Sequence, residues 1–180
     1  MNQNIIKVID KEFSVFITNK EIEASIEKMA EKINQDYKGK KPIFLVILNG
    51  AFMFAADLFK KLTIDCEISF VKLSSYHGTS TTGRVKSLIG LNESIAGRHI
   101  IVVEDIIDTG ITMEHLLEEL DSKHPLDIRI ATLLYKPLAF QKDYTIDYIG
   151  LEIPNDFIIG YGLDYDGFAR NLPDIYKLVK

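Results

Sequence analysis

The sequence of 180 residues has little of the features that mark secreted, membrane-spanning or nucleic acid-coating proteins. Its single cysteine, Cys66, excludes a disulfide within the chain and fits a reducing compartment. The longest uncharged run, residues 42–56, is too short to span a bilayer. Residues 1–13 mix charges with short apolar pairs and lack the apolar core of a signal peptide. We therefore expect a cytoplasmic protein with no membrane partner.

The sequence also has fewer basic than acidic residues. The chain has 21 Lys and Arg against 26 Asp and Glu, which gives a formal net charge of −5. Affinity for nucleic acid comes from clustered Lys and Arg, and the densest run here is residues 38–41. We therefore expect no nucleic acid partner. An anionic small ligand would have to be attracted by something other than the net charge.

The spacing of apolar residues predicts helices that alternate with buried strands. Thr18 and Glu21 have the spacing of a capping box, and apolar residues then recur three or four apart as far as Tyr37. Residues 43–48 and 100–103 are continuously apolar, as expected for parallel strands covered on both faces. The predicted helices are residues 18–37, 51–61 and 112–120, and the predicted strands are residues 43–48, 64–70, 84–91, 100–103, 128–135, 148–152 and 158–161. This order predicts one α/β domain with a mainly parallel sheet, whose site lies beyond the carboxyl ends of the strands.

Residues 102–112, Val-Val-Glu-Asp-Ile-Ile-Asp-Thr-Gly-Ile-Thr, carry the clearest chemical signal. An apolar strand leads into Glu104 and Asp105, and Asp108 precedes a turn of small residues that opens a helix. Backbone N–H groups at a helix N-terminus favour a phosphate, and Gly110 lets the backbone approach it closely. Two adjacent carboxylates would repel that phosphate unless they bind hydroxyl groups or a metal ion. The alternative is a solvated strand-to-helix loop.

This segment closely resembles the phosphoribosyl diphosphate (PRPP) motif of the type I phosphoribosyltransferases, which is four hydrophobic residues, two acids, a short spacer and Asp-Thr/Ser-Gly-x-Thr. The resemblance implies that PRPP is bound by Glu104, Asp105, Asp108, Thr109, Gly110, Ile111 and Thr112. It also implies the fold of that family, a mainly parallel central sheet flanked by helices, with a small hood and a long flexible catalytic loop. The single domain would cover residues 1–180, with a core of about 40–150 and a hood made of the N-terminal residues and about 151–180.

Segments between residues 48 and 170 match the 6-oxopurine branch of the family, the hypoxanthine-guanine phosphoribosyltransferases. Residues 48–58 resemble its pyrophosphate loop, which implies that Asn49 and Gly50 contact pyrophosphate, often through a non-proline cis peptide. The family often has a basic residue at the position of Asn49, so this chain keeps the backbone donor and lacks the cation. The polar residues 74–83 resemble the flexible catalytic loop, with Ser75 and Tyr76, although a long hairpin connection is the alternative.

Three further matches complete the expected site. The purine base would be bound by Lys136, Phe157, Ile158 and Asp164. An ammonium group at Lys136 suits the 6-oxo group of a purine and disfavours a 6-amino group, which is itself a donor. Packing in the core is the alternative for Phe157, and a solvated strand end is the alternative for Lys136. Arg170 resembles the arginine that contacts pyrophosphate.

The resemblance implies an Mg²⁺-dependent enzyme of purine salvage. It would transfer the 5-phosphoribosyl group of PRPP to N9 of hypoxanthine, and of guanine, giving IMP or GMP and pyrophosphate. Asp108 would be the general acid/base at the purine N7, and Glu104, Asp105 and Asp164 would hold the metal. Because the family commonly forms dimers or tetramers, we expect a homodimer or homotetramer. Two alternatives stay open, a PRPP-sensing regulator of the same fold and a transferase that prefers another base, xanthine in particular.

Overall fold

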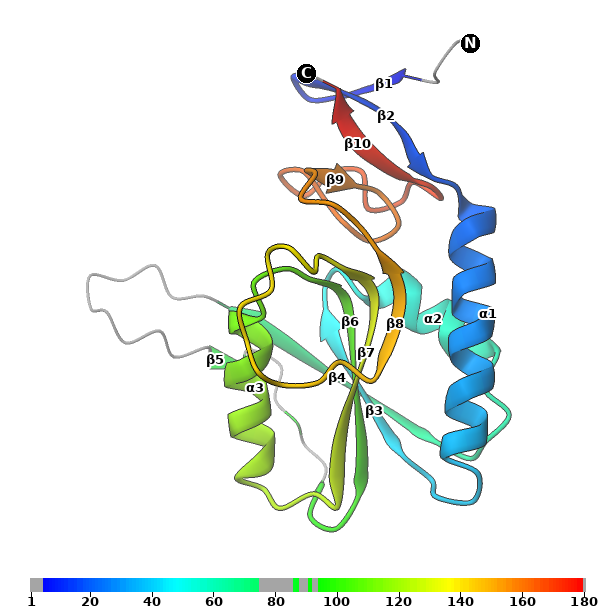
Figure 1. Ribbon diagram of the computed structural model, residues 1–180, viewed down its shortest axis with the longest axis vertical. Helices are drawn as coiled ribbons and strands as arrows, with labels where there is room; N and C mark the ends of the chain where they lie inside the picture. The colour runs from blue at the N-terminus through cyan, green and yellow to red at the C-terminus, as the bar shows by residue number, and fades with distance from the viewer. Residues whose placement is uncertain (1–4, 75–85, 88–90, 92–93, 180) are drawn as a thin grey trace, which may run out of the picture.

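The computed structural model describes residues 5–74, 86–87, 91 and 94–179, and it contains two β-sheets and three helices within these residues (Figure 1). The strands are β1 (Ile5–Val8), β2 (Lys11–Ile17), β3 (Ile43–Leu48), β4 (Glu67–Ser74), β5 (Lys86–Ser87), β6 (His99–Ile107), β7 (Asp127–Tyr135), β8 (Tyr148–Glu152), β9 (Ile158–Ile159) and β10 (Ile175–Val179). The helices are α1 (Asn19–Asp36), α2 (Phe52–Lys60) and α3 (Ile111–Asp121).

The larger sheet has the order β5-β4-β3-β6-β7-β8. Its strands β4, β3, β6, β7 and β8 are parallel to one another, and β5 is antiparallel to β4. Helices α1 and α2 cover one face and α3 covers the other (Figure 1). Consecutive residues of β3, such as Phe44 and Leu45, are therefore buried on opposite sides of the sheet. This arrangement explains the continuous apolar runs and confirms the predicted α/β fold.

Helix α1 begins at the predicted capping box. The Thr18 hydroxyl accepts a hydrogen bond from the Glu21 backbone N–H, and the Glu21 carboxylate accepts one from the Thr18 backbone N–H at 2.8 Å. The flanking Ile17 and Ile22 are both buried. The predicted helix is thus confirmed from its first turn.

Three predicted strands differ clearly in their bounds from the structure. The strand predicted at residues 64–70 begins at Glu67, because β3 begins at Ile43 and these two residues are paired in register. The strand predicted at residues 158–161 ends at Ile159, because Gly160 turns the chain with a φ of +94°. In addition, β6 does not end at the acids but continues through Glu104 and Asp105 to Ile107.

The smaller sheet has the order β1-β2-β10-β9 and is antiparallel throughout. Together with residues 153–174, which connect β8 to β10, we call it the hood. Figure 1 shows the hood at the top of the molecule, beyond the end of β8, with both chain ends in it. Its own small core consists of Phe13, Ile159 and Tyr176. The sequence pattern did not predict β1, β2 or β10.

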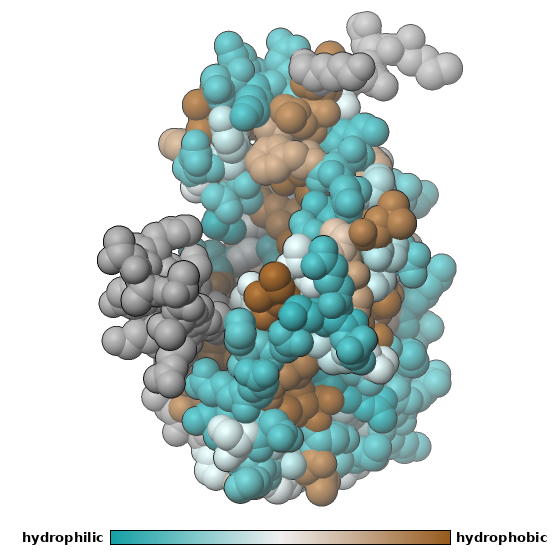
Figure 2. Space-filling model, turned by 60° about the vertical axis from the view of Figure 1, so that its left-hand side comes forward, coloured by the Kyte–Doolittle hydropathy of each residue, from teal (hydrophilic) through white to brown (hydrophobic). Residues whose placement is uncertain are grey.

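Hydrophilic residues cover most of the face seen in Figure 2, and hydrophobic residues appear there in separate patches. Among the described helices, none combines the length and apolar character needed to cross a bilayer.

Candidate functional site

Three segments meet beyond β3 and β6, and two of them contribute a glycine at the contact, Gly50 and Gly162. A Cβ atom on Gly50 would collide with the Asp105 carboxylate, and one on Gly162 would collide with the Gly50 carbonyl oxygen. The Leu48–Asn49 peptide bond is cis, as the family resemblance implied. The loop after β3, the acids of β6 and the hood are therefore in direct contact. From the sequence, these three segments were expected to share a site only because of the resemblance to the phosphoribosyltransferases.

Glu104 and Asp105 are consecutive acids in β6, and each carboxylate accepts a hydrogen bond from a neighbouring backbone N–H. The Asp105 backbone N–H donates to the Glu104 carboxylate at 3.0 Å, and the Ile106 N–H donates to the Asp105 carboxylate at 2.8 Å. Burial, followed by the charge of Asp105, raises the pKa of Glu104 well above its usual range. A cation or hydroxyl donors at this pair would remove that penalty, and carboxylate oxygens are ligands that Mg²⁺ prefers.

The turn Asp108–Gly110 opens α3 in the way the motif predicts. Gly110 has a φ of +84° and is the N-cap of the helix, but it has no side chain to accept from the first-turn N–H groups. The Ile111 N–H has only a long hydrogen bond, 3.5 Å, to the Thr109 hydroxyl. The N-terminal turn of α3 thus presents backbone donors that an anion can accept from.

The segment between β7 and β8 supports this turn from behind. The Tyr144 hydroxyl donates to the Gly110 carbonyl oxygen at 3.0 Å, and the Lys142 ammonium lies 2.6 Å from the Glu114 carboxylate in α3. A Cβ atom on Gly110 would lie 2.7 Å from Cε2 of Phe140 and 2.7 Å from the Tyr144 hydroxyl. The sequence pattern singled out none of these three supporting side chains, because it carries no sign of what they contact.

Lys136 and Asp108 are brought together by neighbouring strands. The Lys136 backbone N–H donates to the Ile107 carbonyl at 3.0 Å, which aligns the ends of β6 and β7. The Lys136 ammonium then lies 3.3 Å from the Asp108 carboxylate. The lysine side chain is 11% exposed and the aspartate side chain is 51% exposed, so the pair sits at the wall of an open site. Lys136 is therefore not the solvated strand end that was its alternative.

Phe157 projects from the hood, where 46% of its surface is exposed. Its ring packs on Phe13, with centroids 6.2 Å apart, and edge-on against Tyr165 at 5.9 Å. Ile158, the next residue, is buried in β9. Phe157 is thus only partly used in packing, and much of its ring surface is free to contact a ligand.

Asp164 and Arg170 are bonded to each other. The Arg170 guanidinium lies 2.6 Å from one oxygen of Asp164 and donates to the Gly162 carbonyl at 2.7 Å. The second oxygen of Asp164 accepts from the Gly167 N–H at 2.7 Å. Arg170 therefore holds the turn that touches Gly50, in addition to any contact it makes with a ligand. Ser75 and Tyr76, the remaining predicted residues, lie outside the described part of the chain.

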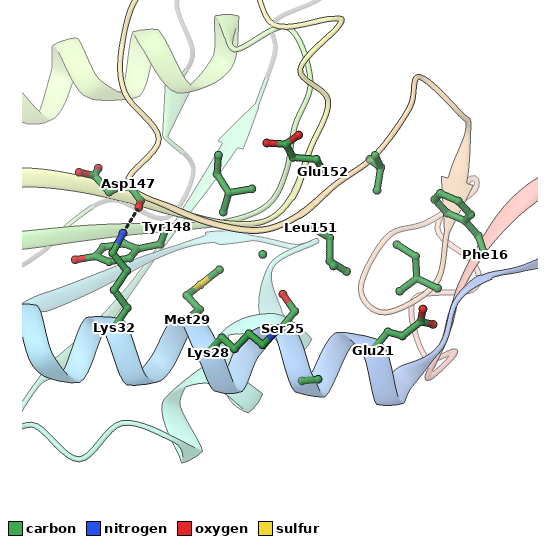
Figure 3. A pocket seen from close by; sticks show the side chains of 15 residues that line it. Phe16, Glu21, Ser25, Lys28, Met29, Lys32, Asp147, Tyr148, Leu151 and Glu152 are labelled. Carbon is green, nitrogen blue, oxygen red and sulfur yellow. Dashed lines mark hydrogen bonds between the residues drawn. The ribbon is translucent and has the colours of Figure 1, made fainter.

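A cavity of about 540 Å³ lies elsewhere, between α1 and the edge strand β8 (Figure 3). Met29 points into the space between the two elements, and the Lys32 ammonium at one end donates to the Asp147 carbonyl at 3.3 Å. None of the residues that line it belongs to the predicted site. Within the described residues, no three His, Cys, Asp or Glu side chains converge as a preformed metal site either.

Comparisons with known proteins agree with the geometry. The family model described as "Phosphoribosyl transferase domain" matches residues 16–166. A hypoxanthine-guanine phosphoribosyltransferase of Mycobacterium tuberculosis is 39% identical over 172 residues, covering 92% of this chain and 85% of that protein. The Lactococcus lactis enzyme of the same name is 39% identical over 174 residues, covering 96% and 93%. A crystal structure of such an enzyme from Bacillus anthracis superimposes with a TM-score of 0.87 at 38% identity, covering 92% of this chain and 98% of that one.

Proposed function

The chain belongs to the phosphoribosyltransferase family, and from this premise we propose that it is a hypoxanthine-guanine phosphoribosyltransferase of purine salvage. It joins N9 of hypoxanthine or guanine to C1 of the ribose of PRPP and breaks the bond from C1 to pyrophosphate, so that IMP or GMP is formed. The observation that carries this proposal is the Lys136–Asp108 pair, which joins the end of β7 to the turn that follows β6 within the PRPP motif.

The PRPP molecule would lie along β6 and the turn that follows it. Its 5-phosphate would accept hydrogen bonds from the N–H groups of residues 109–112, where α3 presents unpaired donors. The hydroxyl groups of the ribose would donate to Glu104 and Asp105. The pyrophosphate would lie against Asn49 and Gly50, with Arg170 nearby in the hood.

The purine base would lie between the core and the hood. Lys136 would donate to the 6-oxo group, which selects against a 6-amino group, and Phe157 would stack on the ring. Asp108 would accept the proton that the base loses at N7 while N9 attacks C1. Its place 3.3 Å from Lys136 would let the ammonium steady the negative charge that develops on the base.

Mg²⁺ is the metal that this set of residues fits best. Glu104 and Asp105 would hold it together with oxygens of PRPP, and Asp164, whose carboxylate is bonded to Arg170 and Gly167, would reach a second ion from the hood. When bound, the metal neutralises charge on the pyrophosphate as it leaves. The raised pKa of Glu104 is consistent with the proposal, because it is caused by burial and by the charge of Asp105, and a bound cation would offset both.

We also propose that the protein acts as a homodimer or homotetramer in the cytoplasm. Three large apolar side chains on α2 and β4, those of Phe52, Ile68 and Phe70, are 39–43% exposed. Apolar surface of this kind commonly marks a contact between subunits. Light scattering after size-exclusion chromatography would give the subunit number, and a monomer at micromolar concentration would contradict the proposal.

The function is tested by assaying the purified protein with PRPP, Mg²⁺ and one base at a time, following nucleotide formation and pyrophosphate release. We expect turnover with hypoxanthine and guanine, and none with adenine or pyrimidines. Turnover with xanthine alone would instead identify a xanthine transferase. No turnover with any base, together with RNA or DNA retardation in a gel at moderate salt, would identify a regulator. Full activity in excess chelator would contradict the role of the metal.

A further inference from the structure

One hydrogen bond ties the hood to the core through two residues, Tyr161 and Asp57, that have no role in the proposed mechanism. The Tyr161 hydroxyl donates to the Asp57 carboxylate in α2 at 2.5 Å. Tyr161 is buried, with 1% of its surface exposed, in the loop that leaves β9. Asp57 lies in the helix that directly follows the pyrophosphate loop. The bond therefore links the two segments on either side of the Gly50–Gly162 contact.

The backbone around Tyr161 is held from the hood side as well. Its N–H donates to the Leu172 carbonyl at 2.9 Å, and the N–H of Gly162 donates to the Arg170 carbonyl at 2.9 Å. The next residue, Gly162, rests directly on the Gly50 carbonyl. A shift of Tyr161 away from α2 would thus carry Gly162 and its neighbours away from the pyrophosphate loop.

The pKa shifts of both partners favour the hydrogen-bonded forms, an ionised Asp57 carboxylate and a protonated Tyr161 hydroxyl. Although burial alone would raise it, the pKa of the Asp57 carboxyl is lowered, because Lys60 and Tyr161 both donate hydrogen bonds to it. Burial, followed by the bond to Asp57, raises the pKa of the Tyr161 hydroxyl far above its usual range. Lys60 lies 2.5 Å from the same carboxylate, but its side chain is 72% exposed and is not part of the hood. Among the described residues, Tyr161 is the hood side chain that hydrogen-bonds to α2.

We propose that Tyr161 and Asp57 are positioning residues, whose bond sets the distance between the base held by the hood and the ribose held by the core. This inference rests on the proposed function. In the hood the base would contact Phe157 and Ile158. Most contacts of PRPP, those with residues 49–50 and 104–112, would be in the core, and Arg170 would reach its pyrophosphate from the hood. Since N9 must lie within about 3–3.5 Å of C1 for attack, a small displacement of the hood slows the reaction much more than it weakens the binding of PRPP, most of whose contacts are in the core.

The test compares Tyr161→Phe, Asp57→Asn and Asp57→Ala with a control, Lys60→Gln, which changes the other partner of the same carboxylate. Tyr161→Phe should lower kcat about tenfold or more and leave the Kd of PRPP, measured by calorimetry, within about twofold. Asp57→Asn keeps an oxygen that accepts from Tyr161, so its kcat should lie between those of Asp57→Ala and the wild type. Lys60→Gln should keep the wild-type kcat.

Two outcomes would overturn the inference while leaving the proposed function intact. One is a wild-type kcat in Tyr161→Phe. The other is an equal loss of kcat and PRPP affinity in all four variants, which would mean that the bond serves only stability. If the wild-type protein turns over no purine at all, it is the proposed function that fails. The wild-type assay therefore separates the two failures.

Discussion

The Lys136 ammonium reaches across from the end of β7 to within 3.3 Å of the Asp108 carboxylate, which follows β6. Parallel neighbours β6 and β7 bring these ends together, so the pair is a direct product of the sheet order. Before substrate binds, each charge is the partner of the other. In the proposed function, a 6-oxopurine would insert its carbonyl and its N7 proton between them, so that the ammonium would donate to the carbonyl and the carboxylate would accept from N7–H.

Replacing Asp108 with Asn should separate catalysis from binding. The amide cannot take up the N7 proton, so kcat should fall by roughly 10²- to 10⁴-fold. The backbone donors of the phosphate turn are unchanged, so the Kd of PRPP should change little. Steady-state kinetics and calorimetry would measure the two quantities, with Asp121→Asn at the exposed end of α3 as the control. Unchanged turnover in Asp108→Asn would remove Asp108 from the mechanism.

Alanine at Gly50 should abolish most of the activity by steric conflict. The added Cβ would collide with the Asp105 carboxylate, so the pyrophosphate loop and the acids of β6 could not both keep their places. The control is Gly97→Ala, where a Cβ meets nothing within 4 Å and the φ of +69° costs only about 1–2 kcal/mol of stability. We expect kcat/KM for PRPP to fall at least about 100-fold in the first variant and to stay near the wild-type value in the second. Similar kinetics in both variants would contradict the contact.

Tyr144→Phe should weaken PRPP binding selectively. It removes the hydrogen bond that holds the Gly110 carbonyl, and a neutral hydrogen bond contributes roughly 1 kcal/mol, or about fivefold in an equilibrium constant. The KM for PRPP should therefore rise about fivefold, while kcat and the KM for hypoxanthine stay near wild type. Tyr148→Phe makes the same change where the hydroxyl bonds Asp36, away from the site, and serves as the control. Equal KM values for PRPP in both variants would show that Tyr144 does not support the turn.

The free energy of unfolding should depend on pH at acid values because of Asp57. Its pKa is lowered in the folded chain, so its ionised form stabilises the fold fully above the unfolded-chain value of about 3.9. That contribution is lost as the pH falls through the lower pKa of the folded protein. Urea unfolding of the wild type and of Asp57→Asn should therefore differ most near neutral pH and converge once the pH is below the lowered pKa of Asp57 in the folded protein. A difference that stays constant between these limits would contradict the assignment.

Elements with local signals were predictable from the sequence, whereas those set by distant partners were not. The capping box at Thr18 and the motif at residues 102–112 depend on residues close in sequence, and the structure places both where they were expected. The start of β4 depends on its register with β3, and β2 depends on pairing with β10 at the other end of the chain. No local pattern encodes such pairings.

The same division holds for the site. The chemistry of Asp108 and Lys136 follows from a motif and a strand end, and the structure brings the two together. By contrast, the bond between Arg170 and Asp164 and the support of Gly110 by Tyr144 arise from how loops fold back on one another. The roles of all these residues toward substrate stay predictions until they are tested as described.

The pairing of β2 with β10 has a consequence for the order in which the protein is made. During synthesis on the ribosome, β3, β6 and β7 emerge and can assemble while β10 has yet to be translated. The small sheet can form in full only when β10 pairs with β2, since β10 lies between β2 and β9 in the strand order. A nascent chain would therefore acquire the turn at residues 108–110 well before it acquires the hood. In the proposed function, which places the base against the hood, pairing of β10 with β2 would be the step that completes the site.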